Sequence, residues 1–215
     1  TPIGNLGDIT MRAIETLRGL DILFSEDTRT TKRLLDRYGI AVPQDSYREE
    51  AHERKSRRVI ELLREGKNVG LVSDAGTPGI ADPGARLVRD VLAALPDTTI
   101  IQIPGPSAVV AAFSIAGFPA DGFVFLGWPP HKKGRNAFFD LAMSQILPVV
   151  LYESPHRVVK TLGEIAKRDE SRHLVICREL TKIYETVERG TAGELSIMAK
   201  TKEPRGEYAI VIDRP

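Results

Sequence analysis

Residues 73–84, SDAGTPGIADPG, combine small, glycine, proline and acidic residues directly after the apolar run at 69–72. A short apolar run containing valine predicts a buried strand, and Asp82 followed by Pro83 is typical of the start of a helix. A turn of small residues between a strand and a helix lies at the carboxyl edge of an α/β sheet. Ligands bind there, and glycine lets them approach the backbone. The sequence therefore predicts a ligand-binding loop over residues 73–84.

The acidic residues of this loop restrict the class of ligand. Gly79 and Gly84 have the separation of a P-loop, but an Ala-Arg pair at 85–86 stands where lysine and serine or threonine would follow. The chain also contains no GxGxxG. Asp74 and Asp82 would repel a polyphosphate and would tolerate a cofactor that carries positive charge. A purely structural alternative, in which both aspartates only cap and turn the backbone, stays open.

Positive charge is concentrated in one loop, residues 128–135, WPPHKKGR, which has three fixed cations, an aromatic ring and no acid. The net charge of the whole chain is only +1, so no general basic field indicates nucleic acid. A loop of this composition suits phosphates and unstacked bases. Two further groups of cations, at 29–37 and 54–58, have acidic residues nearby, and we expect them to form solvated helix faces.

The chain of 215 residues, with 42% hydrophobic and 27% charged residues, has the composition of a globular protein with one large or two small domains. No apolar run is long enough to span a membrane, and we expect a cytoplasmic enzyme. The single cysteine, Cys177, excludes an internal disulfide and is expected in the core. Four scattered histidines, without HExxH or a cysteine pair, predict no metal site.

Alternating apolar and amphipathic segments predict an α/β protein of two domains, residues 1–116 and 117–215, with a cleft between them. The segment 117–122, GFPADG, interrupts the pattern and is the candidate linker. Helices are expected to begin at Asp8 or Thr10, to cover 49–65, and to form a buried apolar segment at 108–113. Strands are expected at 22–24, 69–72 and 99–103 in the first domain and at 123–126, 148–152, 174–178, 184–188 and 208–212 in the second.

Six short motifs occur in the order found in one family. They are residues 1–10 (TPIGNLGDIT), 26–29 (EDTR), 73–84, 104–108 (PGPSA), 152–157 (YESPHR) and 178–182 (RELTK). Through these motifs the whole chain resembles the tetrapyrrole methylase-like S-adenosylmethionine-dependent methyltransferases, and within them the bacterial small-subunit rRNA methyltransferase I group. One departure is Ala51, which stands where the family pattern leads us to expect asparagine.

The resemblance implies 2'-O-methylation of a cytidine of 16S rRNA, at the decoding centre of the small ribosomal subunit, by a homodimer that uses S-adenosylmethionine. Matched motif by motif, it implies a cofactor pocket formed by Pro2, Ala75, Gly76, Thr77, Ile80, Ser107, Ala108, Tyr152, Glu153, Leu180 and Ala209. Small residues and backbone groups can hold the amino-acid and adenosine parts of such a cofactor. For Ile80 and Ala108, plain core packing stays an alternative.

Methyl transfer to a ribose hydroxyl needs in-line placement and benefits from a base, or from a cation that stabilises the developing alkoxide. Asp27 and Glu26 are candidates for the base, and Arg29 and Lys182 for the cation. A structural ion pair between Glu26 and Arg29 is the alternative. The expected RNA contacts are Arg33, Lys132, Lys133, Arg135, His156 and Arg157.

Two other functions stay open at this point. Methylation of a small molecule such as a tetrapyrrole predicts an enclosed apolar trough, whereas the loop at 128–135 is cationic and polar. A non-catalytic RNA-binding factor of ribosome assembly predicts binding without turnover. A nucleotide hydrolase is disfavoured because the Walker lysine is missing.

Overall fold

The computed structural model describes all residues 1–215, and they form two compact units, Thr1–Ser107 and Ala108–Pro215. The expected boundary followed residue 116, whereas the observed one precedes helix α5 (Ala108–Ser114). This helix groups with the second unit because it packs on strands β5 (Val149–Glu153) and β8 (Tyr208–Ile212). No helix is both long and apolar enough to cross a membrane.

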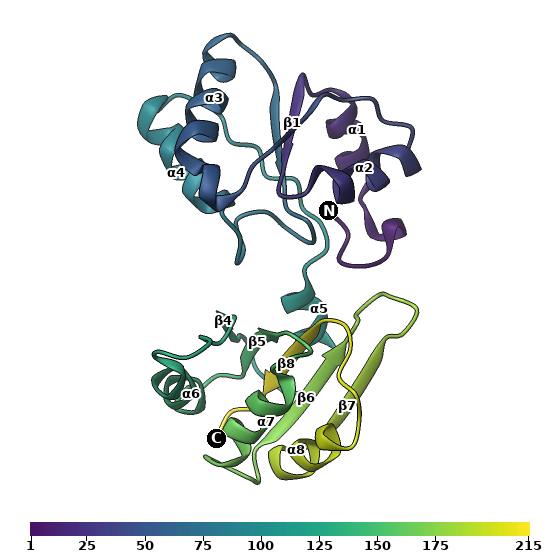
Figure 1. Ribbon diagram of the computed structural model, residues 1–215, viewed down its shortest axis with the longest axis vertical. Helices are drawn as coiled ribbons and strands as arrows, with labels where there is room; N and C mark the ends of the chain where they lie inside the picture. Colours follow the sequence, from purple (N-terminus) through teal and green to yellow (C-terminus); the bar gives the residue numbers. More distant parts are fainter. The chain divides into compact units, whose positions relative to one another are not determined.

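The first unit is built on a parallel sheet in the order β2-β1-β3, formed by Gln44–Ser46, Ile22–Ser25 and Val69–Val72. Helices α1 (Met11–Arg18) and α2 (Thr28–Arg37) lie on one side of it, and α3 (His52–Arg64) and α4 (Gly84–Ala94) on the other (Figure 1). Short 3₁₀ helices cover Leu6–Asp8 and Glu49–Ala51.

The alternation of side chains along β1 explains the two helical layers. Leu23 packs with Leu17 and Leu35 on the side of α1 and α2, whereas Phe24 packs with Val59 and Leu87 on the side of α3 and α4. Because all three strands are parallel, their carboxyl ends lie at one edge of the sheet. The loops that follow β1 and β3 therefore begin next to each other.

The strand predicted at 99–103 does not form, and this prediction was wrong. Residues 98–107 have no regular structure and pair with no strand. Ile100 and Ile101 are 47% and 73% exposed, so these apolar side chains do not join the core. Strand β2, by contrast, gave no sequence signal because its three residues, Gln-Asp-Ser, are polar. An apolar run forms a strand only where a neighbour supplies backbone hydrogen bonds.

Helix starts follow the sequence signals closely. The Thr10 side chain accepts a hydrogen bond from the backbone N–H of Ala13 at 3.1 Å, which starts α1 at one of the two expected places. The Asp82 carboxylate accepts a hydrogen bond from the N–H of Gly84 at 2.7 Å, and α4 begins at Gly84. The proline at 83 therefore precedes the helix rather than opening it.

The second unit contains a five-stranded sheet in the order β4-β5-β8-β6-β7. Its further strands are β4 (Val124–Gly127), β6 (His173–Arg178) and β7 (Thr186–Thr191), and its further helices are α6 (Arg135–Met143), α7 (Val158–Ala166) and α8 (Ala192–Lys200). Strands β4 and β5 are parallel, and the other neighbours are antiparallel. The strands run side by side with α7 and α8 in front of them in Figure 1.

The main core of this unit joins one face of the sheet to its helices. Leu151 and Ile210 pack with Leu162 of α7 and Leu195 of α8. On α5, Val109 is buried while Val110 is 57% exposed, so this helix is buried on one side only, not throughout as expected. Cys177 is fully buried in β6 without a disulfide, as predicted, and burial raises the pKa of its thiol to about 11.

Candidate cofactor and RNA site

Three loops of the first unit meet at Gly76. Its backbone N–H lies 3.1 Å from the carbonyl oxygen of Thr1 and 3.4 Å from that of Pro2. A Cβ added at Gly76 would lie 3.5 Å from Ile3 Cγ2 and from the Pro106 carbonyl oxygen. The Thr77 hydroxyl donates to that same carbonyl at 3.3 Å. The structure thus brings together the segments that carry the expected cofactor residues Pro2, Ala75, Gly76, Thr77 and Ser107.

The loop at 73–84 is held in a fixed shape by its own polar groups. Gly76, Gly79 and Ala81 have φ angles of 78°, 88° and 61°, and Ala81 adopts this left-handed conformation without being glycine. The Asp82 carboxylate accepts the N–H groups of Gly79 at 2.9 Å and Gly84 at 2.7 Å. Asp82 therefore has the structural role that the sequence left open, and its hydrogen bonds hold the turn of the loop.

Not all of the expected cofactor residues in this loop are buried. Gly76 is buried and Thr77 is half-buried, whereas Ala75 is exposed and Ile80 is 51% exposed. Core packing therefore does not account for Ile80. An exposed apolar side chain beside a rigid glycine turn is available to contact the apolar part of a ligand.

The carboxylate of Asp27 is engaged in structural hydrogen bonds. It caps α2 by accepting the Arg29 backbone N–H at 2.8 Å, and it also accepts Arg29 Nε at 3.0 Å and Nη2 at 2.6 Å. These hydrogen bonds hold the pKa of Asp27 well below its ordinary value. A carboxylate of such low basicity is a poor general base, and the ion pair that the sequence left open joins Arg29 to Asp27 rather than to Glu26.

Glu26 has the opposite electrostatic environment. Partial burial raises its pKa, and repulsion from the carboxylates of Asp74 and Asp82 raises it further. Asp74 is fixed in place because it accepts the backbone N–H of Asp27 at 2.9 Å. Of the two candidate bases, Glu26 is therefore the more basic carboxylate.

In the second unit, Ala108, Tyr152 and Ala209 lie close together. Tyr152 on β5 pairs with Ala209 on β8. Helix α5, which begins at Ala108, packs on β5 and β8, and burial raises the pKa of the Tyr152 phenol. Three of the expected cofactor residues are thus grouped within this unit.

The backbone around Leu180 is strained. Glu179 and Thr181 have φ angles of 53° and 66°, a left-handed conformation that residues with a Cβ rarely adopt. Lys182 holds this bend, because its Nζ donates to Glu179 Oε1 at 2.8 Å and Glu207 Oε2 at 2.9 Å. Because the ammonium group of Lys182 is already paired with two carboxylates, a structural role is favoured over the expected stabilisation of an alkoxide. Such strain is typical of residues at functional sites.

Glu153 lies in a buried ion cluster, not at a ligand-facing surface. It is fully buried, accepts hydrogen bonds from the Thr161 hydroxyl at 2.5 Å and the Ser154 N–H at 2.8 Å, and forms an ion pair with Arg157 Nη2 at 2.8 Å. Arg135, 5% exposed, donates to the Thr161 hydroxyl at 2.7 Å and lies 3.9 Å from Glu153. Both carboxylate oxygens of Glu153 are bonded to groups of the protein itself. This disfavours the expected contact of Glu153 with a cofactor.

The two arginines of this cluster are bonded to internal groups. Arg135 Nη1 donates to the carbonyl of Pro130 at 3.0 Å, and Arg157 Nη1 donates to that of Pro129 at 2.8 Å. Both were expected to contact RNA directly, but the burial of Arg135 and the internal partners of both guanidinium groups oppose this role. Their hydrogen bonds fix the start of the loop at 128–135 instead.

The remaining cations of this loop are available to a ligand. Lys132 and Lys133 are exposed and form no ion pair, and His131 is exposed beside them. His156, before α7, and Arg33, on α2, are also exposed. These exposed side chains stay candidates for phosphate contacts.

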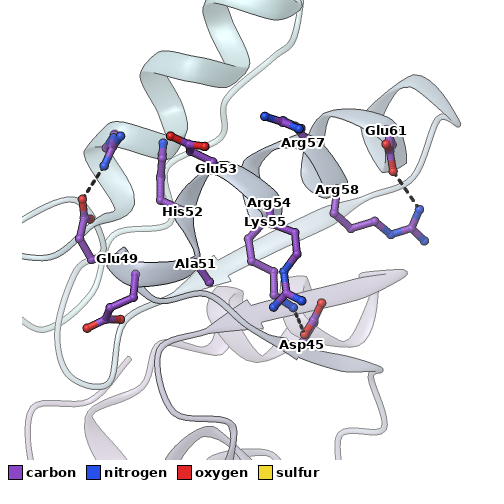
Figure 2. A pocket seen from close by; sticks show the side chains of 12 residues that line it. Asp45, Glu49, Ala51, His52, Glu53, Arg54, Lys55, Arg57, Arg58 and Glu61 are labelled. Atoms are coloured by element: carbon purple, nitrogen blue, oxygen red, sulfur yellow. Dashed lines mark hydrogen bonds and ion pairs between the residues drawn. The ribbon is translucent and has the colours of Figure 1, made fainter.

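A separate charged groove of about 930 Å³ lies along α3 and contains none of the expected site residues. Figure 2 shows cations and carboxylates interleaved along its wall. Lys55 pairs with Asp45 at 2.5 Å, and Arg58 pairs with Glu61 at 3.4 Å. This pairing agrees with the expectation that the cations at 54–58 form a solvated face balanced by acids.

One buried polar chain was missed by the sequence analysis. The Tyr47 hydroxyl lies 2.6 Å from His52 Nδ1, and His52 Nε2 lies 2.7 Å from Asp90 Oδ2. Tyr47 and His52 are both buried, and burial raises the pKa of Tyr47 to about 12. No spacing rule joins positions 47, 52 and 90, so only the packing of α3 against α4 reveals the chain. It links these helices to the end of β2.

Comparison with known proteins assigns the family. The model of the "Tetrapyrrole (Corrin/Porphyrin) Methylases" family matches residues 1–196. The chain is 42% identical over 214 residues to Ribosomal RNA small subunit methyltransferase I of Halalkalibacterium halodurans, covering 99% of this chain and 73% of the relative. It is 39% identical over 212 residues to the protein of the same name from Thermotoga maritima, covering 99% of this chain and 95% of the relative.

Solved structures agree on the fold. A diphthine synthase superposes with a TM-score of 0.75 at 16% identity, covering 99% of this chain and 87% of that one. A uroporphyrin-III-C-methyltransferase from Thermus thermophilus superposes with a TM-score of 0.69 at 18% identity, covering 98% and 90%. The predicted α/β class of the tetrapyrrole methylase-like type is confirmed. The chain therefore belongs to the tetrapyrrole methylase family and, within it, to the ribosomal RNA small subunit methyltransferase I group.

Proposed function

We propose that the chain transfers a methyl group from S-adenosylmethionine to the 2'-hydroxyl of a cytidine in 16S rRNA, at the decoding centre of the small ribosomal subunit. The observation that carries this proposal is identity of 39–42% over 99% of the chain to relatives named as small-subunit rRNA methyltransferases. A ribosomal substrate would place the enzyme in the cytoplasm, and the family resemblance favours a homodimer.

The residues of both units fit S-adenosylmethionine. In the first unit, the fixed loop around Gly76 offers backbone groups and small side chains, and the half-exposed Ile80 can contact an apolar part of the ligand. In the second, Ala108, Tyr152 and Ala209 are grouped, and Leu180 lies on a strained bend. When bound, the cofactor would supply a methyl group on a positively charged sulfur, which needs only a correctly oriented acceptor.

In this proposal the protein orients the ribose and takes up its proton. Glu26 would accept the proton of the 2'-hydroxyl, since its raised pKa makes it more basic than an ordinary carboxylate. Asp27 and Arg29 would hold the start of α2, which fixes the backbone next to Glu26. Lys182 would hold the bend around Leu180.

The proposal is tested by incubating the protein with labelled S-adenosylmethionine and small ribosomal subunits that lack the modification. Matched controls are already modified small subunits and large subunits. The proposal requires label in the rRNA of the unmodified small subunits only. Binding of the cofactor without transfer to any RNA, or transfer to a tetrapyrrole instead, would contradict it.

A further inference from the structure

The only tryptophan of the chain, Trp128, is held at the surface of the second unit. It is 45% exposed, although tryptophan side chains are highly buried on average. Gly127 before it has a φ of 68°, and Pro129 and Pro130 follow it. The left-handed glycine and the two prolines restrict the backbone on both sides of the ring.

The buried ion cluster fixes this segment further. Arg157 and Arg135 hold the carbonyls of Pro129 and Pro130 at 2.8 and 3.0 Å, and Glu153 anchors both arginines from within the core. A segment held in this way loses little conformational entropy when a ligand binds. The cluster therefore presents Trp128 in a fixed position.

Other aromatic rings support the indole. Its centroid lies 5.5 Å from the ring of Tyr152, and the Tyr152 ring lies 4.9 Å from that of Phe125. Tyr152 itself is anchored in the sheet, because it lies on β5 between β4 and β8 and pairs with Ala209. The indole thus packs on an anchored ring and keeps nearly half of its surface open.

The charges beside the indole indicate the chemistry of its ligand. His131, Lys132 and Lys133 are exposed, and neither lysine forms an ion pair. The loop from residue 128 to 135 contains no carboxylate. An open aromatic ring next to unpaired cations is the arrangement that binds single-stranded nucleic acid, by stacking on the base and attraction of the phosphates.

We propose that Trp128 stacks on an unpaired base of the RNA substrate and that Lys132 and Lys133 hold the adjoining phosphates. Arg135 and Arg157 act as positioning residues, which hold the loop without touching RNA. Because Trp128 packs on Tyr152, an expected cofactor residue, the stacked base is that of the methylated nucleotide or of its neighbour. This inference rests on the proposed function and adds to it the residue that recognises the base.

The tryptophan fluorescence of the protein reports on this ring alone. In a titration with a short single-stranded RNA rich in cytidine, without cofactor, we expect saturable quenching of the emission. Trp128→Ala should weaken RNA binding about tenfold or more, and Trp128→Phe should retain most of the affinity. Lys132→Ala/Lys133→Ala should weaken binding and still reach full quenching at saturation.

Several outcomes would overturn the stacking role. One is unchanged fluorescence at RNA concentrations that saturate binding in a filter assay. A second is wild-type affinity of a folded Trp128→Ala protein for the RNA. A third is equal quenching by an abasic strand or by polyglutamate, and quenching by polyglutamate would indicate an acidic protein partner.

The stacking role of Trp128 and the proposed methyl transfer can be contradicted independently of each other. Methyl transfer by Trp128→Ala with an unchanged kcat/KM would overturn the stacking role and leave the proposed function standing. Quenching of the wild-type protein by RNA without any methyl transfer would support the stacking role and contradict the proposed function.

Discussion

Replacing Glu153 by alanine should destabilise the second unit far more than removal of a surface carboxylate. Glu153 is fully buried, accepts two hydrogen bonds and forms an ion pair with Arg157 at 2.8 Å. Glu153→Ala would leave the buried guanidinium of Arg135 and that of Arg157 without their counter-charge. Breaking a buried pair in this way costs about 3–5 kcal/mol. For a chain of this size the midpoint of thermal unfolding should fall by about 6–20 °C.

The assay is urea unfolding of the wild-type protein and of variants, followed by circular dichroism. Glu203→Ala is the matched control, because Glu203 and its partner Arg205 are 76% and 72% exposed, and such surface pairs contribute about 0–1 kcal/mol. Adding Arg157→Met to Glu153→Ala removes one stranded charge, so the double variant should be less destabilised than the sum of the single ones. Equal losses for Glu153→Ala and Glu203→Ala would refute the reasoning.

Three further predictions concern the proposed sites. Gly76→Val should reduce cofactor binding in calorimetry below detection. The control Gly39→Ala, at a residue with a positive φ and open space around an added Cβ, should bind the cofactor normally. Normal binding by Gly76→Val would contradict the placement of the cofactor at Gly76. Glu26→Gln should lower kcat about 100-fold or more. A general base must be deprotonated, and the pKa of Glu26 is raised, so the wild-type rate should fall as the pH drops through that raised pKa. Glu26→Gln should lose this pH dependence. The same pH–rate profile in the variant and the wild type would exclude Glu26 as the base. Lys132→Ala/Lys133→Ala should reduce the slope of log K against log salt for single-stranded RNA by about 1.4, and an unchanged slope would rule out phosphate contacts.

The sequence predicted the elements whose patterns reflect local burial. The apolar runs at 22–24 and 69–72 form β1 and β3 because the helical layers cover both faces of the sheet. The run at 99–103 is rich in isoleucine and stays irregular, since strand formation depends on a partner that composition does not reveal. Strand β2 is the opposite case, because its residues are polar and it forms a strand by pairing with β1.

The candidate site was predictable where glycine and small residues fix the backbone. The segments around Pro2, Gly76 and Thr77 do meet, as the motifs implied. The roles of individual side chains were less predictable. Charged residues are expected at the surface, whereas Arg135 and Glu153 are buried. Glu153 and Arg157 are four residues apart, but Glu153 ends β5 and Arg157 precedes α7, so the helical spacing rule does not predict their ion pair.

Nucleoside analysis of the methylated rRNA is the decisive test of the proposed 2'-O-methyl transfer. After incubation of unmodified small ribosomal subunits with labelled S-adenosylmethionine, the 16S rRNA is digested to nucleosides and separated by mass. We expect the label in 2'-O-methylcytidine, and we expect Glu26→Gln to reduce it greatly. Label in a base-methylated nucleoside, or no label in RNA from a protein that binds the cofactor, would contradict the proposed function.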